Sequence, residues 1–346
     1  MTKSASRLLI PSSGSPHVSA GWVAFLLVAG IAIAAGASLA FGARIISLGD
    51  IIDGLFRPEV INLEAVVVRR RLVRTIFSLM AGSALGVSGA LMKAITRNPI
   101  ADPSVLGVNT GASLFVVWGI AYLGITTAFW YVILALAGAG AAAVIVYGMG
   151  SMGRGGTTPI KLALAGASVS AAFSSLISAI MLPRSNVMNE FRFWQVGSTG
   201  GATWEGILQI APLIVVAMVI AFFSAPALNA LALGDEAATG LGVRVGFLRL
   251  INAVAGVVLC GAITALAGPI GFIGLMASHV VRLLVGPDLR KVLPLAALGG
   301  ACILTIADIT GRLILRPREL EVGIVTAFLG APLLIYIATH SRVRAS

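Results

Sequence analysis

Residues 71–94, RLVRTIFSLMAGSALGVSGALMKA, decide the class of fold to which this chain belongs. Beyond Arg74 the stretch is apolar apart from small hydroxyl residues and one lysine. It is long enough for a helix that crosses a bilayer, which needs about 20 residues. Gly82 and Gly86 stand four apart and predict a face of small residues where a second helix can approach closely. We therefore predict a membrane-spanning helix packed inside a bundle.

The composition of the whole chain extends this interpretation. Of 346 residues, 58% are hydrophobic and only 11% are charged, whereas a soluble domain carries about 25% charged residues. So few charges exclude a soluble enzyme, and continuous apolar runs exclude the short alternating segments of a β-barrel. The chain is predicted to be an all-α polytopic membrane protein with ten spans, at residues 22–42, 71–94, 105–123, 127–148, 159–182, 205–224, 247–267, 270–286, 292–314 and 322–339.

The polar segments between these runs predict the organisation of the chain. Residues 1–21 are expected to form a cytoplasmic tail, residues 22–340 the membrane domain and residues 341–346 a second cytoplasmic tail. An even number of spans places both tails on one side. Residues 226–246 are polar enough to leave the membrane on that same side. On this assignment every lysine lies inside, and arginine supplies all the positive charge outside.

Several kinds of chemistry are not expected of this chain. The phosphate-binding pattern G-x-x-x-x-G-K-[ST] does not occur, so ATP hydrolysis would have to lie on another chain. Basic residues are scattered over many loops, which argues against nucleic acid as a partner. Cys260 and Cys302 lie in apolar runs, and His17, His279 and His340 are far apart. We therefore expect no disulfide framework, metal site or cofactor.

Residues 226–246 are the best candidate for a surface that receives force from another protein. We expect an apolar patch formed by Leu228, Leu231 and Leu233, followed by a sharp turn at Gly234. Asp235 and Glu236 suit the start of a short helix, and Gly240 and Gly242 would end it. The alternative is an amphipathic helix lying on lipid. That alternative predicts basic residues on the polar face, yet residues 226–243 contain two acids and no basic residue.

Arginines gather in the outer segments. Arg71 and Arg74 are three apart at the predicted start of a helix, so they share a face. Positive charge is disfavoured there by the helix dipole, and an external anionic partner would explain it. Arginines that flank a bilayer also serve as simple anchors, and this alternative stays open for Arg69 and Arg70. Asp308 is the single acid within an apolar run, and pairing with Arg312 would explain its presence.

The polar residues within the apolar runs are the hardest part of the sequence to interpret. Ser170, Ser174 and Ser178 recur every four residues and line one face of a predicted helix, while Asn109 and Thr110 are polar near the start of another. These side chains could form a weakly polar lining. They could equally stabilise close helix packing, with hydroxyl groups bonded to backbone carbonyls one turn earlier.

Four separate blocks of the sequence resemble one known family. They are residues 71–113 (RLVRTIFSLMAGSALGVSGALMKAITRNPIADPSVLGVNTGAS), 228–243 (LNALALGDEAATGLGV), 268–282 (GPIGFIGLMASHVVR) and 307–333 (ADITGRLILRPRELEVGIVTAFLGAPL). In this order they are similar to type II ABC importer permeases for iron-siderophores, haem and vitamin B12, from about residue 45 onward. One departure is Ser278, which stands where the family usually has proline before His279.

The resemblance implies a fold, a set of partners and several site residues. The fold would be a ten-helix permease in the cytoplasmic membrane of a bacterium. Its partners would be a second permease, two cytoplasmic ATPase subunits and an extracytoplasmic binding protein. The ATPase-coupling residues would be those of the segment above, together with Ala237 and Leu241. The binding protein would dock through its acidic residues on Arg71, Arg74, Arg312, Arg316 and Arg318.

The choice of substrate and mechanism follows from the same blocks. Residues 97–113 and 307–337 look most like ferric-siderophore permeases, with haem or vitamin B12 as the alternative cargo. An ion-coupled secondary transporter is a more distant alternative, because it requires a functional ionisable residue inside the membrane. Asp308 is the one acidic candidate. A membrane enzyme would need converging catalytic groups, and the sequence shows none.

Overall fold

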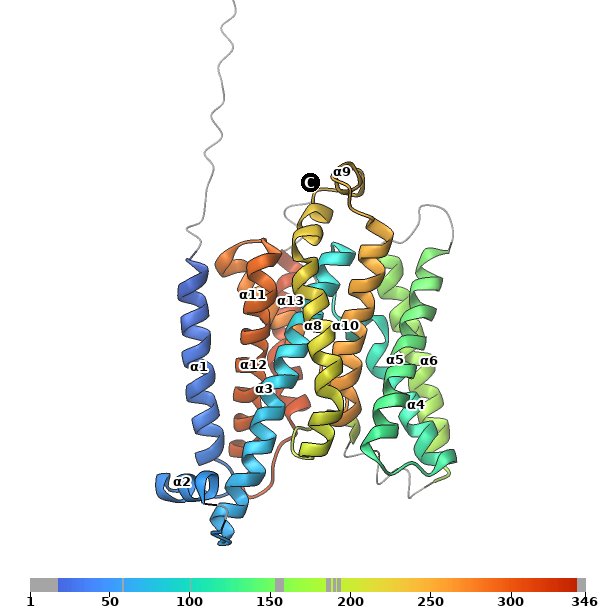
Figure 1. Ribbon diagram of the computed structural model, residues 1–346. Coiled ribbons are helices and arrows are strands. Elements are labelled where there is room, and N and C mark those ends of the chain that lie inside the picture. Colours follow the sequence, from blue (N-terminus) through green and yellow to red (C-terminus); the bar gives the residue numbers. More distant parts are fainter. Residues whose placement is uncertain are drawn as a thin grey trace, which may run out of the picture.

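The computed structural model describes residues 18–57, 59–99, 101–152, 159–184, 188, 191 and 194–340. Within these ranges the chain is helical and contains no strand. The long apolar helices stand side by side as a bundle (Figure 1). They are α1 (Ala20–Ala40), α3 (Leu63–Thr96), α4 (Val108–Trp118) with its continuation η2 (Gly119–Leu123), α5 (Ala128–Ser151), α6 (Pro159–Met181), α8 (Trp204–Ala232), α10 (Val245–Ala267), α11 (Ile273–Val285), α12 (Leu289–Ile314) and α13 (Val322–His340).

All ten predicted spans coincide with helices. In the described part of the chain, seven helices are long and apolar enough to cross a membrane, and three shorter apolar helices fill the positions of the other spans. The three are 108–123, Ile273–Val285 and Val322–Ile337. The start of α1 and the end of α13 lie at the same end of the bundle as a short helix, α9 (Asp235–Gly240) (Figure 1). The all-α polytopic fold is thus confirmed.

Two boundaries differ from the prediction. Helix α3 begins at Leu63, where Asn62 accepts a hydrogen bond from the Ala65 amide. Arg71 and Arg74 therefore lie two to three turns inside α3, and the prediction that they stand at a helix start is wrong. Helix α8 continues to Ala232, so only the residues after it leave the bundle, rather than all of 226–246.

The small-residue face of α3 packs against α12. A Cβ atom added to Gly82 would overlap the carbonyl group of Gly300, and one added to Gly86 would overlap the carbonyl oxygen of Ala296. The backbones of the two helices are therefore in direct contact, as the spacing of the glycines predicted. Helix α11 runs unbroken through Ser278, whose hydroxyl donates to the Gly274 carbonyl.

Replacement of Gly82 by alanine should destabilise the protein by about 1–3 kcal/mol, because the new methyl group forces two packed backbones apart. Thermal unfolding of the purified protein in detergent measures this loss. Gly36→Ala is the matched control, since a Cβ at Gly36 meets no atom within 4 Å. Equal stability of the two variants would show that α3 and α12 are not in backbone contact.

Candidate coupling surface and outer arginine cluster

Helix α9 is flanked by glycines at which the chain turns. Gly234, which precedes it, has φ +123°, and Gly242, which follows it, has φ +82°. Residues other than glycine rarely adopt these φ values. The two glycines therefore allow the chain to turn sharply out of α8 and back into α10. Asp235 and Glu236 occupy the first turn of α9, where the helix dipole favours negative charge. The turn, the acidic start and the glycine end are all found where the sequence predicts them.

The exposed apolar residues of this segment differ from those predicted. Leu228 and Leu231 are 1% and 0% exposed, because α8 is still part of the bundle at these positions. Leu233 and Leu241 are 71% and 66% exposed and flank α9 on either side. The prediction that Leu228 and Leu231 form an exposed patch is therefore wrong. The exposed apolar side chains of the segment belong to residues that lie outside α8.

Asp235 ties α9 to two long helices. Arg97, which follows the last residue of α3 in a left-handed conformation (φ 51°), donates from Nη2 to Asp235 Oδ1 and to the Leu231 carbonyl. Arg249, in α10, donates to the same carboxylate oxygen over 2.9 Å. The Asp235 carboxylate thus joins α9 to the ends of α3 and α10, and Arg97 adds a contact to the end of α8. Sequence analysis missed this arrangement, because Arg97 and Asp235 are 138 residues apart.

A second polar contact fixes the same end of the bundle. Asp288, which precedes α12, accepts hydrogen bonds from the Arg290 amide and from the side chain of Asn229 in α8. These two donors, led by the backbone amide, lower the pKa of the Asp288 carboxyl group. Asn229 in turn accepts from the Leu289 amide. The last turns of α8 and the first turn of α12 are therefore joined beside α9.

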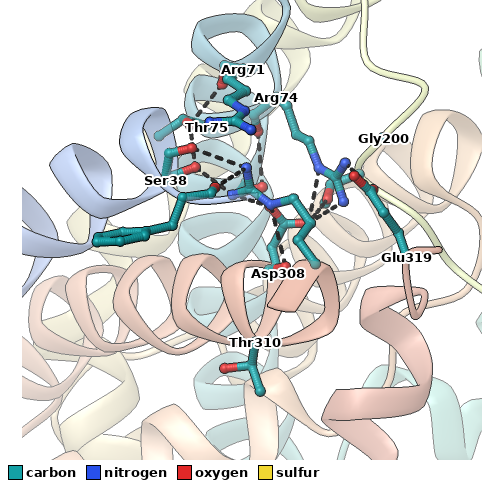
Figure 2. Close-up of polar contacts among 12 residues, drawn as sticks. Ser38, Arg71, Arg74, Thr75, Gly200, Asp308, Thr310 and Glu319 are labelled. Atoms are coloured by element: carbon teal, nitrogen blue, oxygen red, sulfur yellow. Dashed lines mark hydrogen bonds and ion pairs between the residues drawn. The ribbon is translucent and has the colours of Figure 1, made fainter. Parts of the chain in front are cut away.

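A buried carboxylate organises the opposite end of the bundle (Figure 2). Asp308 of α12 is 1% exposed. Its Oδ1 accepts from Arg74 at 2.7 and 3.0 Å and from Thr199 at 2.7 Å, and its Oδ2 forms an ion pair with Arg312 at 2.9 Å. Arg74 also donates to Glu319 over 2.6 Å. The predicted pair of Asp308 and Arg312 is confirmed, and it is one part of a larger cluster.

Two arginines of this cluster, Arg312 and Arg71, donate hydrogen bonds to groups near the end of α1. Arg312 is 1% exposed and donates to the carbonyl and the hydroxyl group of Ser38, near the end of α1. Arg71 is also buried and donates to carbonyl groups just before and after the end of α1, those of Leu39, Ala40 and Arg44. Together these contacts fasten α1, α3 and α12 to one another.

The five predicted docking arginines therefore fall into two groups. Arg71 and Arg312 are buried, and Arg74 is nearly so, with a side chain that is 12% exposed. Their placement contradicts direct docking by Arg71 and Arg312 in this conformation, because each guanidinium group is enclosed by its own chain. Arg316 and Arg318 are exposed at the same end.

The residues predicted to line a path also fall into two groups, those in contacts between helices and those exposed on α6. Asn109 is buried and accepts hydrogen bonds from Thr264 at 3.1 Å and from Cys260 at 3.3 Å, so it joins α4 to α10. Thr110 donates to Ser170, which joins α4 to α6. These contacts favour the packing interpretation for Asn109, Thr110 and Ser170. Ser174 and Ser178 are exposed on α6, and the Ser178 hydroxyl donates to the Ser174 carbonyl.

No group of three His, Cys, Asp or Glu side chains is arranged to hold a metal ion among the residues that the structure describes. Cys260 and Cys302 are both free thiols, as their positions in apolar runs suggest.

Comparison with known proteins identifies the family. The model of the FecCD transport family matches residues 27–340. The chain belongs to the FecCD transport family. It is 40% identical over 307 residues to the Fe(3+)-citrate import system permease protein YfmD of Bacillus subtilis, covering 89% of this chain and 91% of that protein. It is 45% identical over 272 residues to the ferric enterobactin permease FepD of Escherichia coli, covering 79% and 81%.

A solved structure supports the assignment of this FecCD chain. A metal-chelate type ABC transporter in an inward-facing conformation superposes with a TM-score of 0.78 and 25% identity. The match covers 93% of this chain and all of that one. The FecCD chain is thus an integral membrane permease and a transport component.

Proposed function

We propose that this chain is the membrane-spanning subunit of an ATP-driven importer that moves a ferric-siderophore complex across the cytoplasmic membrane of a bacterium. It would work with a second permease, two cytoplasmic ATPase subunits and an extracytoplasmic binding protein. The exposed helix α9 carries this proposal. It projects from one end of the bundle between two glycine turns, and the chain has no phosphate-binding loop of its own.

The proposed ATPase contact is the outer surface of α9 and its flanks. Leu233 and Leu241 supply exposed apolar area, and Glu236 is an exposed carboxylate in the first turn. The remaining members are small, which leaves the backbone accessible: Gly234, Ala237, Gly240 and Gly242. Apolar anchors surrounded by polar groups are typical of protein interfaces. Asp235 has a different role in this proposal, because its carboxylate is engaged by Arg97 and Arg249.

A ferric siderophore is the cargo that the relatives favour. The two relatives described above are permeases for ferric citrate and ferric enterobactin, at 40% and 45% identity. The hemin permease HmuU of Yersinia pestis is 34% identical over 80% of this chain. Haem or vitamin B12 is therefore the second candidate. Ser174 and Ser178 remain proposed contacts on the path, where weak polar groups would let a large chelate pass.

An ion-coupled mechanism finds no support at Asp308. Intramembrane carboxylates in such transporters exchange ions or protons. Asp308 is instead held between Arg74 and Arg312 and accepts from Thr199. These contacts favour a structural role for Asp308, which links α3 to α12.

Reconstitution of the whole complex tests the proposal. The chain should co-purify with an ATPase subunit. The ATPase activity of the reconstituted complex should rise when the binding protein carries a ferric siderophore. A panel of ferric chelates, haem and cobalamin identifies the cargo. Uptake should stop with vanadate or with a catalytically dead ATPase. Uptake that is driven by an ion gradient in the absence of ATP would overturn the proposal.

Docking of the binding protein is proposed at Arg316 and Arg318, beside the Arg74–Glu319 ion pair. Exposed arginines form paired hydrogen bonds with carboxylates and speed the association of acidic partners. Arg74 lies at the edge of this surface.

Reversal of both charges, Arg316→Glu with Arg318→Glu, should slow association of the binding protein several-fold, and the loss should shrink at high salt. Surface plasmon resonance on the complex in nanodiscs measures the rate. Arg44→Glu with Arg57→Glu is the matched control, because it changes the net charge equally at exposed positions of the same end. Identical rates for the two double variants would place docking elsewhere.

A further inference from the structure

Helix α2 (Leu48–Phe56) has an exposed apolar side that the bundle leaves uncovered. Ser47 begins the helix by accepting a hydrogen bond from the Asp50 amide. Leu48, Ile52 and Phe56 are 73%, 47% and 76% exposed, and they recur every four residues on one side. Ile45, just before the helix, is exposed as well. We call these four residues the α2 apolar stripe.

The orientation of α2 is fixed by its contact with α3. Gly54 is buried there, and a Cβ atom at this position would lie 2.8 Å from Val68 Cβ. Arg69 of α3 donates to the carbonyls of Gly54, Arg57 and Val60, which secures the end of α2. On a helix with 3.6 residues per turn, Ile52 lies almost opposite Gly54. The stripe therefore faces away from the bundle.

The charged residues of α2 lie on a separate side. Asp50, Asp53 and Arg57 fall together on the helical wheel, on the side away from the stripe. Asp50 accepts from the Ser47 hydroxyl, and Asp53 forms an ion pair with Arg57 at 3.0 Å. The short helix thus has one apolar side, one charged side and an edge on α3. This division is typical of a helix at the boundary between lipid and water.

The neighbouring helix indicates what covers the stripe. Helix α1 buries only Val23, Ala34 and Ser38. Its exposed apolar side chains run along its length and reach Phe41, four residues before Ile45. In an integral membrane protein such a surface faces lipid. Helix α2 lies across the end of α1, at the end of the bundle opposite α9 (Figure 1).

We infer that α2 rests on the outer boundary of the bilayer, with the α2 apolar stripe in contact with lipid. The stripe continues the lipid-facing surface of α1, and the charged side of α2 faces water. This contact holds the connection between α1 and α3 at a fixed depth. It does not depend on the cargo or on the ATPase partner.

Spin labels on single cysteines test this inference. The labels are placed at Ile52 and, as the control on the charged side, at Asp53, in a chain that carries Cys260→Ala and Cys302→Ala. The protein is reconstituted into phosphatidylcholine nanodiscs, and power saturation compares collisions with oxygen and with a water-soluble nickel chelate. The label at 52 should favour oxygen, and the label at 53 should favour nickel.

Two other results would overturn the inference. A label at 52 that collides freely with nickel would place the stripe in water. A label at 52 that is shielded from both reagents would show that protein covers it, either a second copy or the binding protein. A label at Leu48 repeats the measurement should labelling at 52 disturb the fold.

Discussion

Replacement of Asp308 by asparagine should destabilise the protein by about 3–5 kcal/mol, which is the usual cost of removing one partner from a buried ion pair. The substitution leaves Arg312 buried without its counter-charge, and it removes the negative charge from the group that accepts hydrogen bonds from Arg74 and Thr199. The loss is measured as the free energy of unfolding in a reversible denaturation of the purified protein. It should be accompanied by reduced amounts of folded protein in the membrane.

The control for this prediction is Asp53→Asn. Asp53 pairs with Arg57 at the surface of α2, where ion pairs contribute at most about 1 kcal/mol. A second arm combines Asp308→Asn with Arg312→Gln, which removes both charges and should recover part of the stability. The prediction fails if Asp308→Asn and Asp53→Asn unfold alike. Charge reversal at Arg312 is expected to unfold the protein for the same reason. Charge reversal at Arg71 is expected to do so because it would bury a carboxylate among the carbonyl groups of Leu39, Ala40 and Arg44. Neither variant can therefore serve as a test of docking.

Replacement of Arg97 by glutamine, or of Asp235 by asparagine, should reduce the cargo imported per ATP hydrolysed. Asp235 joins α9 to α3 through Arg97 and to α10 through Arg249. Each half-exposed pair is worth up to about 1 kcal/mol. Loss of about 1–2 kcal/mol corresponds to a change of roughly 5- to 30-fold in the fraction of α9 that is held against the bundle.

Uptake and ATP hydrolysis are measured together on the reconstituted complex. We expect hydrolysis and assembly to persist while uptake falls, and Asp235→Glu to restore part of it. Arg290→Gln, at an exposed arginine of the same end, is the control. If the variants no longer assemble into the complex while the cargo imported per ATP is unchanged, these residues stabilise the complex and do not couple ATP hydrolysis to import. If they behave like the control, the carboxylate has no part in coupling.

Much of the bundle could be predicted from the sequence, because a helix that crosses a bilayer requires a long apolar run and each such run predicts one helix. The two errors at helix ends have physical causes. Residues 63–70 carry several charges, but they form the first two turns of α3 because a helix of 34 residues extends past the hydrocarbon layer. The polarity of residues 226–246 predicts an exit from the membrane, yet α8 continues through Pro226 to Ala232 because Leu228 and Leu231 are buried in the bundle.

The candidate sites were only partly predictable. The pair of Asp308 and Arg312 lies four residues apart on one helix, so the spacing alone revealed it. Arg74 and Asp308 are 234 residues apart, and no local pattern joins them. Leu228 and Leu233 have the same chemistry, and their burial differs only because α8 ends between them. Partners brought together by packing require the structure.

The length of α3 has one further consequence. Arg74, in the buried cluster, and Arg97, beside α9, lie on this helix and its first following residue, so they are separated by about 35 Å of continuous backbone at 1.5 Å per residue. Between these two arginines, at Gly82 and Gly86, the backbone of α3 is in direct contact with that of α12. A tilt of α3 as one rigid body would therefore move both arginines together. A single helix thus connects the buried arginine cluster at one end of the bundle with the contact of α9 at the other.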